Sequence, residues 1–131
     1  MDENKLKQCC ESLRDFFDEK IHTGNLSKDD LTKIHEQVCM TCTELAPDYA
    51  LDNQKSAFSE DEITAMKDFL KTTIDDTVLQ EMQKCKSGEA LIQSYLSTII
   101  RSIGDYDFGE ATRIKEIIAP VLQEIQKNNS K

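Results

Sequence analysis

The stretch that decides the fold is Leu26-Ser27-Lys28-Asp29-Asp30-Leu31, and its pattern returns as Phe58-Ser59-Glu60-Asp61-Glu62-Ile63. In each copy the serine hydroxyl can accept a hydrogen bond from the backbone N–H three residues later. The acid at that third position can reach back toward the serine, and the flanking apolar residues can clasp the turn as a hydrophobic staple. Both stretches therefore predict the start of an α-helix, at about residues 28 and 60.

Apolar residues that recur at every third or fourth position extend these starts into amphipathic helices. Gly24 is expected to end the first helix and Gly104 the fourth, because glycine readily adopts the left-handed conformation that closes a helix. The second helix is expected to end before Pro47, since the residue preceding a proline avoids helical geometry. We therefore predict five helices, over about 3–22, 28–45, 60–86, 89–103 and 108–127.

The third and fifth of these helices each contain an irregular point. The stretch 71–77 resembles a further, fainter helix start, because it combines two threonines with an Asp pair, but we expect the helix to continue through it. Pro120 is expected to kink or break the fifth helix, since it removes one backbone hydrogen bond and crowds the preceding turn. Asp107 is the expected N-cap of that helix, with Glu110 three residues later.

The segment 47–58 is expected to be a loop, because it holds a proline and four polar residues that favour turns. A connection of this length is unusual between packed helices, which makes it a candidate for contact with a partner. The two helix starts lie on either side of the predicted helix 28–45 and this loop, and together they define the segment 26–63. We expect any functional surface of the protein to lie within this segment.

These patterns predict an all-α bundle that forms a single domain over residues 1–131. The ordered part is expected to span about 3–127, with 128–131 as a frayed tail. The core is expected to be led by the large apolar residues on the helix stripes, which are Leu13, Phe16, Phe17, Leu31, Ile34, Val38, Met66, Leu70, Leu96, Ile99, Ile100, Ile117 and Leu122.

The net charge of −9 lies almost entirely in the first half of the chain. Residues 1–62 carry fifteen acids against seven bases, whereas residues 63–131 carry ten against nine. An acidic surface repels the phosphates of nucleic acids and anionic lipids, so we expect neither as a partner. The same surface would attract a basic protein.

The composition predicts a soluble protein of the cytoplasm. The chain starts without a secretion signal, and its apolar runs are far shorter than a membrane crossing requires. Its five cysteines are an odd number and lie within the helical patterns, unlike the loop-rich frameworks of secreted disulfide domains. A reducing compartment fits this arrangement best.

The sharpest candidate for chemistry is His35-Glu36-Gln37-Val38-Cys39-Met40-Thr41-Cys42. On a helix, His35, Cys39 and Cys42 would share one face as three zinc ligands, and Cys9 or Cys10 from a neighbouring helix could supply a fourth. A hydrolytic zinc site is disfavoured, because it needs further neutral ligands and His22 is the only other histidine. A structural zinc site is therefore one alternative.

A second alternative is a small regulatory or phosphocarrier-type helical domain centred on His35. Such a role needs an exposed imidazole in a concave site. Val38 stands three residues after the histidine, where a lysine would be expected in such a domain. The match is therefore confined to a few residues.

The function that the sequence favours is a non-enzymatic protein–protein interaction or adaptor module. We assign no catalytic residue, metal site or cofactor, because none of the candidate sets is complete. The partner is expected to be a protein, bound through a groove between helices or through the acidic half of the surface. This hypothesis predicts an exposed apolar groove or patch, and the pattern defines neither its residues nor the oligomeric state.

Overall fold

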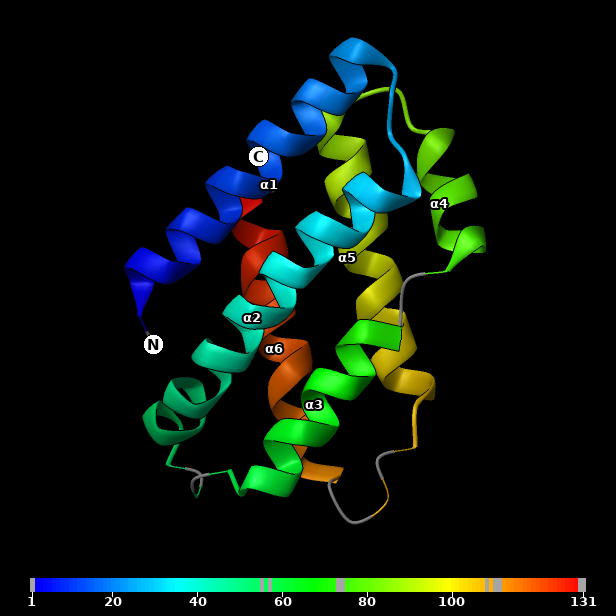
Figure 1. Cartoon of the computed structure of the whole chain (residues 1–131). Coiled ribbons are helices and arrows are strands. Elements are labelled where there is room, and N and C mark those ends of the chain that lie inside the picture. Colours follow the sequence, from blue (N-terminus) through cyan, green and yellow to red (C-terminus); the bar gives the residue numbers. More distant parts are fainter. Residues whose placement is uncertain are drawn as a thin grey trace.

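The computed structural model describes residues 2–54, 56, 58–72, 75–107, 109 and 112–129. Over these residues the chain forms six α-helices and no β-strand (Figure 1). The all-α fold is confirmed, with six helices instead of the five predicted. The helices are α1 (Glu3–Thr23), α2 (Lys28–Asp52), α3 (Glu60–Thr72), α4 (Asp76–Gln83), α5 (Gly88–Asp105) and α6 (Thr112–Asn129).

The helices are arranged in two layers (Figure 1). In one layer α2 lies between α1 and α3, and it packs against both. In the other layer α5 packs against α6, and both of these helices also contact α1. The short helix α4 lies at the edge, against α5 and the beginning of α2.

The two predicted helix starts begin α2 and α3. Before α3, the Ser59 hydroxyl accepts from the Glu62 N–H at 3.2 Å, and the Glu62 carboxylate accepts from the Ser59 N–H at 3.0 Å, which forms a complete capping box. Before α2, the Ser27 hydroxyl accepts from the Asp30 N–H at 3.2 Å and donates to the Asp30 carboxylate at 2.9 Å. Aspartate is one methylene shorter than glutamate, so its carboxylate meets the serine side chain instead of the backbone.

The prediction that the second helix ends before Pro47 is wrong, because α2 continues to Asp52. Residues on both sides of the proline are buried in the core: Ala46 is 1% exposed and Ala50 is fully buried. That burial contributes to offsetting the roughly 3 kcal/mol that an internal proline costs a helix. The amide of Asn53 then donates to the Tyr49 carbonyl at 2.9 Å and caps the last turn. The expected loop over 47–58 is therefore restricted to the residues after α2.

The prediction of one continuous helix over 60–86 is also wrong, because α3 ends at Thr72 and α4 begins at Asp76. The Asp75 carboxylate accepts from the Val78 N–H at 3.0 Å and so starts a new helix. The two helices pack against different neighbours: α3 contacts α2 and α6, whereas α4 contacts mainly α5. Residues 73 and 74 lie outside the described residues.

The last helix runs from Thr112 to Asn129 and is not broken at Pro120. Apolar residues on both sides of the proline are fully or almost fully buried, which holds the helix on the core. The Asp107 carboxylate accepts from the Gly109 N–H at 2.9 Å, while Glu110 and the predicted start at residue 108 lie outside the described residues. Residue 128 and the buried Asn129 belong to this helix, so the prediction of a frayed tail is wrong there; residues 130 and 131 are not described.

The predicted core is largely confirmed. Of its thirteen residues, all are buried except Phe16 and Ile100, which are partly buried and pack against it. Apart from the start of α6, the other predicted helix ends agree with the structure to within three residues. The prediction that Gly104 ends its helix is wrong, because α5 continues to Asp105 and the Tyr106 N–H bonds to the Ser102 carbonyl. Gly24 closes α1 as predicted, with a left-handed φ of 68° and its N–H bonded to the Lys20 carbonyl.

Candidate functional site

The histidine that the sequence singles out lies inside the bundle, where three helices meet. His35 on α2 is 3% exposed. Its Nδ1 lies 2.6 Å from the hydroxyl of Tyr95 on α5, and its Nε2 is hydrogen bonded to the backbone carbonyl of Leu70 in the last turn of α3. The His35 side chain thus joins α2, α3 and α5.

The hydrogen-bond partners define the protonation state of this group. A backbone carbonyl can only accept, so the Nε2–H of His35 donates to the Leu70 carbonyl. Burial lowers the pKa of His35 below its ordinary value of 6.5, and burial raises the pKa of Tyr95 well above its ordinary value. The neutral ring therefore accepts the Tyr95 O–H at Nδ1, which makes His35 a satisfied core residue.

This position argues against the two alternatives that depend on His35. A phosphocarrier needs an exposed imidazole, whereas this ring is enclosed and both of its nitrogens are engaged. A zinc ion would need one of the same nitrogens. The Cys39 Sγ does lie 3.4 Å from Nε2, as the helical spacing predicts, yet the described residues contain no set of three His, Cys, Asp or Glu side chains arranged to hold a metal ion.

All five cysteines are free thiols, and four of them are buried. Cys42 lies close enough to Cys9 and Cys39 for their charges to affect its pKa, so part of the predicted cluster exists. Burial is the main cause that raises the pKa of Cys9 to about 11 and that of Cys39 to about 12. These thiols stay protonated at neutral pH, whereas metal binding and nucleophilic attack need the thiolate.

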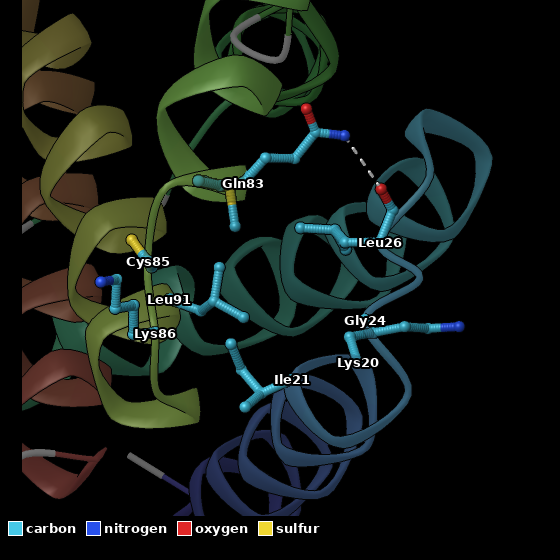
Figure 2. A pocket seen from close by; sticks show the side chains of 9 residues that line it. Lys20, Ile21, Gly24, Leu26, Gln83, Cys85, Lys86 and Leu91 are labelled. Carbon is cyan, nitrogen blue, oxygen red and sulfur yellow. Dashed lines mark hydrogen bonds between the residues drawn. The ribbon is translucent and has the colours of Figure 1, made fainter.

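One hollow of the surface lies where the ends of α1 and α4 meet the start of α5 (Figure 2). Its volume is about 490 Å³. Figure 2 shows the apolar side chains of Ile21, Leu26 and Leu91 gathered around it, and the Gln83 amide donates to the Leu26 carbonyl at 3.3 Å. The lining of the hollow is therefore mixed, with apolar side chains beside polar groups and a hydrogen bond at one side.

Two lysines at the edge of this hollow direct their charged groups away from it. In Figure 2 the ammonium groups of Lys20 and Lys86 point away from the hollow in opposite directions. Lys20 is engaged elsewhere, since its Nζ lies 3.1 Å from the Asp30 carboxylate and 5.5 Å from the centre of the Phe16 ring. The hollow therefore lacks the convergent charges that would orient a polar ligand.

A second, more apolar groove lies between α2 and α3 and has a volume of about 370 Å³. Met40 stands at its mouth with 64% of its surface exposed, more than any other large apolar side chain among the described residues. Leu51 is 61% exposed and lies eleven positions later, about three helical turns along the same side of α2. The groove is lined by Glu36, Cys39, Met40 and Thr43 of α2 and by Lys67 and Lys71 of α3.

The two lysines of this groove are not neutralised within the described part of the chain. Both are exposed, and neither forms an ion pair with a described residue. The charge of Lys71 acts to lower the pKa of Cys39, which places its ammonium group near the groove, while Glu36 acts in the opposite sense. The groove thus combines an exposed apolar wall with two available cations. We call it the α2–α3 groove.

The residues that line the α2–α3 groove are not among the predicted candidates, although the sequence contains two signals for them. Met40 lies off the apolar stripe of α2, on its polar side, so an apolar residue there has no role in the core. Lys67 and Lys71 are separated by four positions and so lie on one face of α3 in an acid-rich chain. The segment 26–63, where a functional surface was expected, contains the α2 residues of the groove but not the two lysines of α3.

Comparison with known proteins gives no match: neither a family model, nor a curated protein, nor a solved structure is similar to this chain. Among the described residues, none of the helices is both long and apolar enough to cross a membrane.

Proposed function

We propose that this chain is a non-enzymatic protein-interaction module whose docking surface is the α2–α3 groove. The observation that carries the proposal is Met40, a large apolar side chain that is mostly exposed beside an apolar groove. Water contact with such a side chain is unfavourable by about 1.5–3 kcal/mol relative to full burial, and covering it would recover part of that free energy. Exposed apolar surface next to a groove is typical of protein-binding sites.

The core supports a binding role over an enzymatic one. His35 is held neutral by Tyr95 and Leu70, and the buried thiols are held protonated. These groups stabilise the bundle on which the groove is built. The five free cysteines also support a reducing compartment, such as the cytoplasm.

The proposal is tested by a matched pair of variants of the full chain. Met40→Glu places a charge at the mouth of the groove, and Gln80→Glu places the same side chain on the exposed surface of α4. Proteins bound to the immobilised chain in its native lysate would be identified by mass spectrometry, purified and titrated by calorimetry. We expect Met40→Glu to weaken binding at least tenfold, since it buries a charge without a partner, while Gln80→Glu binds as the unmodified chain does.

Two results would contradict the proposal. One is a purified partner that binds Met40→Glu and the unmodified chain equally. The other is binding that disappears at high salt and is insensitive to Met40, which would place a basic partner on the acidic half of the surface instead. Circular dichroism spectra of both variants would establish that they remain folded.

A further inference from the structure

We propose that the occupant of the α2–α3 groove is an amphipathic helix of a partner protein that carries two carboxylates one turn apart beside an apolar anchor. This inference rests on the proposed function, because it names the partner chemistry of the same groove. Three features of the groove support it: its two helical walls, the spacing of its lysines and the nature of its apolar wall.

The walls favour a helical occupant. Helices α2 and α3 pack side by side (Figure 1), and side chains of both helices line the groove between them. A third helix laid along such a groove packs its own row of side chains between the other two, at interaxial distances of about 8–10 Å. An apolar face of that helix would cover Met40 in the manner of other helix-in-groove complexes.

The lysines define the charge pattern of the occupant. Lys67 and Lys71 are four residues apart on α3, so they are separated by about 6 Å along the helix axis. Two carboxylates at positions i and i+4 of a helix that runs alongside α3 have the same separation and can pair with both ammonium groups. Because neither lysine has a carboxylate partner among the described residues, no existing ion pair has to be broken.

The net charge of −9 does not prevent this docking. At physiological salt, charges more than about 8 Å away are largely screened, so the field at the groove is set by the charges close to it. These include Asp68, which follows Lys67 in α3 but does not line the groove. Glu36 is the one acid that lines the groove, on the wall opposite the lysines. The carboxylates of the occupant would therefore lie on the α3 side.

The apolar wall defines the anchor. Met40 is unbranched and flexible, and its neighbours in the wall, Cys39 and Thr43, are small. A wall of this kind adapts to a leucine or methionine side chain and selects weakly among apolar anchors. Specificity would then come mainly from the charge pattern.

The test uses two synthetic helical peptides of about twenty residues, long enough to form helix in water. Both carry leucines along one face; one carries glutamates at positions i and i+4 of the flank, and the other carries lysines there. Each peptide would be titrated by fluorescence anisotropy against the full chain, against Lys67→Glu/Lys71→Glu, and against Lys84→Glu/Lys86→Glu. The last variant makes the same change of charge at exposed residues near the end of α4, away from the groove.

We expect the glutamate peptide to bind the unmodified chain. Its affinity should fall about tenfold with Lys67→Glu/Lys71→Glu, since two exposed ion pairs are replaced by repulsion. The lysine peptide should gain affinity for that variant by a similar factor. The α4 control should leave the affinity for the glutamate peptide within about twofold of that of the unmodified chain.

The outcomes separate this inference from the proposed function. If Met40→Glu abolishes binding of partners or peptides while the lysine reversal leaves it unchanged, the groove is a docking site and the charge pattern proposed here is wrong. If the glutamate peptide does not bind, the inference is overturned. If light scattering shows a dimer of the free chain that Met40→Glu dissociates, the occupant is a second copy and the inference is also overturned. Should the double variant fail to fold, Lys71→Gln tests the same contact.

Discussion

At the scale of single residues, the most consequential group is His35, whose burial is made possible by its two partners. A polar ring buried without hydrogen bonds costs several kcal/mol, and the Leu70 carbonyl and the Tyr95 hydroxyl remove that cost. Together these contacts favour the neutral ring, because a protonated ring would lose its acceptor at Nδ1 and would place a charge in the core. His35 therefore links the stability of the bundle to pH.

We predict that the free energy of unfolding falls as the pH is lowered below 6.5. The pKa of His35 is lowered in the folded state, so below its ordinary value of 6.5 the unfolded chain binds more protons than the folded chain. The stabilisation is fully present above pH 6.5 and is lost as the pH falls toward the folded pKa. Its slope cannot exceed about 1.4 kcal/mol per pH unit, the limit for a single proton. Urea unfolding between pH 7.5 and 5 measures it.

The control is the other histidine. His35→Gln should reduce the slope, and it is compared with His22→Gln, which removes an exposed ring at the end of α1. If His35→Gln does not fold, the titration of the His35 ring protons by NMR gives the folded pKa directly. A midpoint for His35 at or above 6.5 is incompatible with this account.

At the scale of elements, the serine caps do most to decide where α2 and α3 begin. Each serine hydroxyl satisfies one backbone N–H that has no partner within the helix. The two caps differ in the reciprocal bond, which reaches the backbone of Ser59 but only the hydroxyl of Ser27. The Lys20 ammonium also bonds to the Asp30 carboxylate and holds the pKa of Asp30 below its ordinary range.

We predict that Ser27→Ala and Ser59→Ala each lower the free energy of unfolding by about 1 kcal/mol, the usual value of an N-cap. Ser27→Thr and Ser59→Thr keep a hydroxyl at the cap and should recover most of that loss. Urea unfolding at constant pH measures all four variants. An alanine variant as stable as the unmodified chain would show that the cap does not stabilise that helix.

At the scale of the whole molecule, α1 and α5 approach each other closely where α5 begins. A Cβ atom on Gly88 would lie 1.9 Å from the Asp18 carboxylate oxygen and 3.2 Å from the Asp18 backbone Cα. The carboxylate can move aside, but the backbone of α1 cannot move without disturbing the layer. Gly88 is therefore required by packing between helices and not by its own backbone conformation.

We predict opposite effects for two alanine substitutions in α5. Gly88→Ala should destabilise the fold by about 1–3 kcal/mol, the usual cost of overpacking. Gly104→Ala should stabilise it by up to about 1 kcal/mol, because a Cβ there meets no atom of another element within 4 Å and alanine is the better helix former. Thermal and urea unfolding of both variants and of the unmodified chain measure these differences in the free energy of unfolding. Equal effects would show that the approach of α1 to α5 is not tight.

The candidate site could be predicted from the sequence only in part. The sequence placed His35, Cys39 and Cys42 on one helix face, which the structure confirms, but their spacing does not reveal whether that face is buried. The Tyr95 hydroxyl that holds His35 is sixty residues away in the chain. The groove likewise needs Met40 of α2 beside Lys67 of α3, and no local pattern brings two such positions together.

What the sequence by itself determined is the all-α class, the capped starts of α2 and α3, and most of the core, because these follow from backbone preferences and periodicities among neighbouring residues. Only the tertiary structure decided that α2 passes Pro47, that the segment 60–86 is divided between α3 and α4, that His35 is buried, and that a groove lies beside Met40. The physical reason is that local preferences are worth about 1 kcal/mol each, whereas burial against distant helices contributes more and can override them.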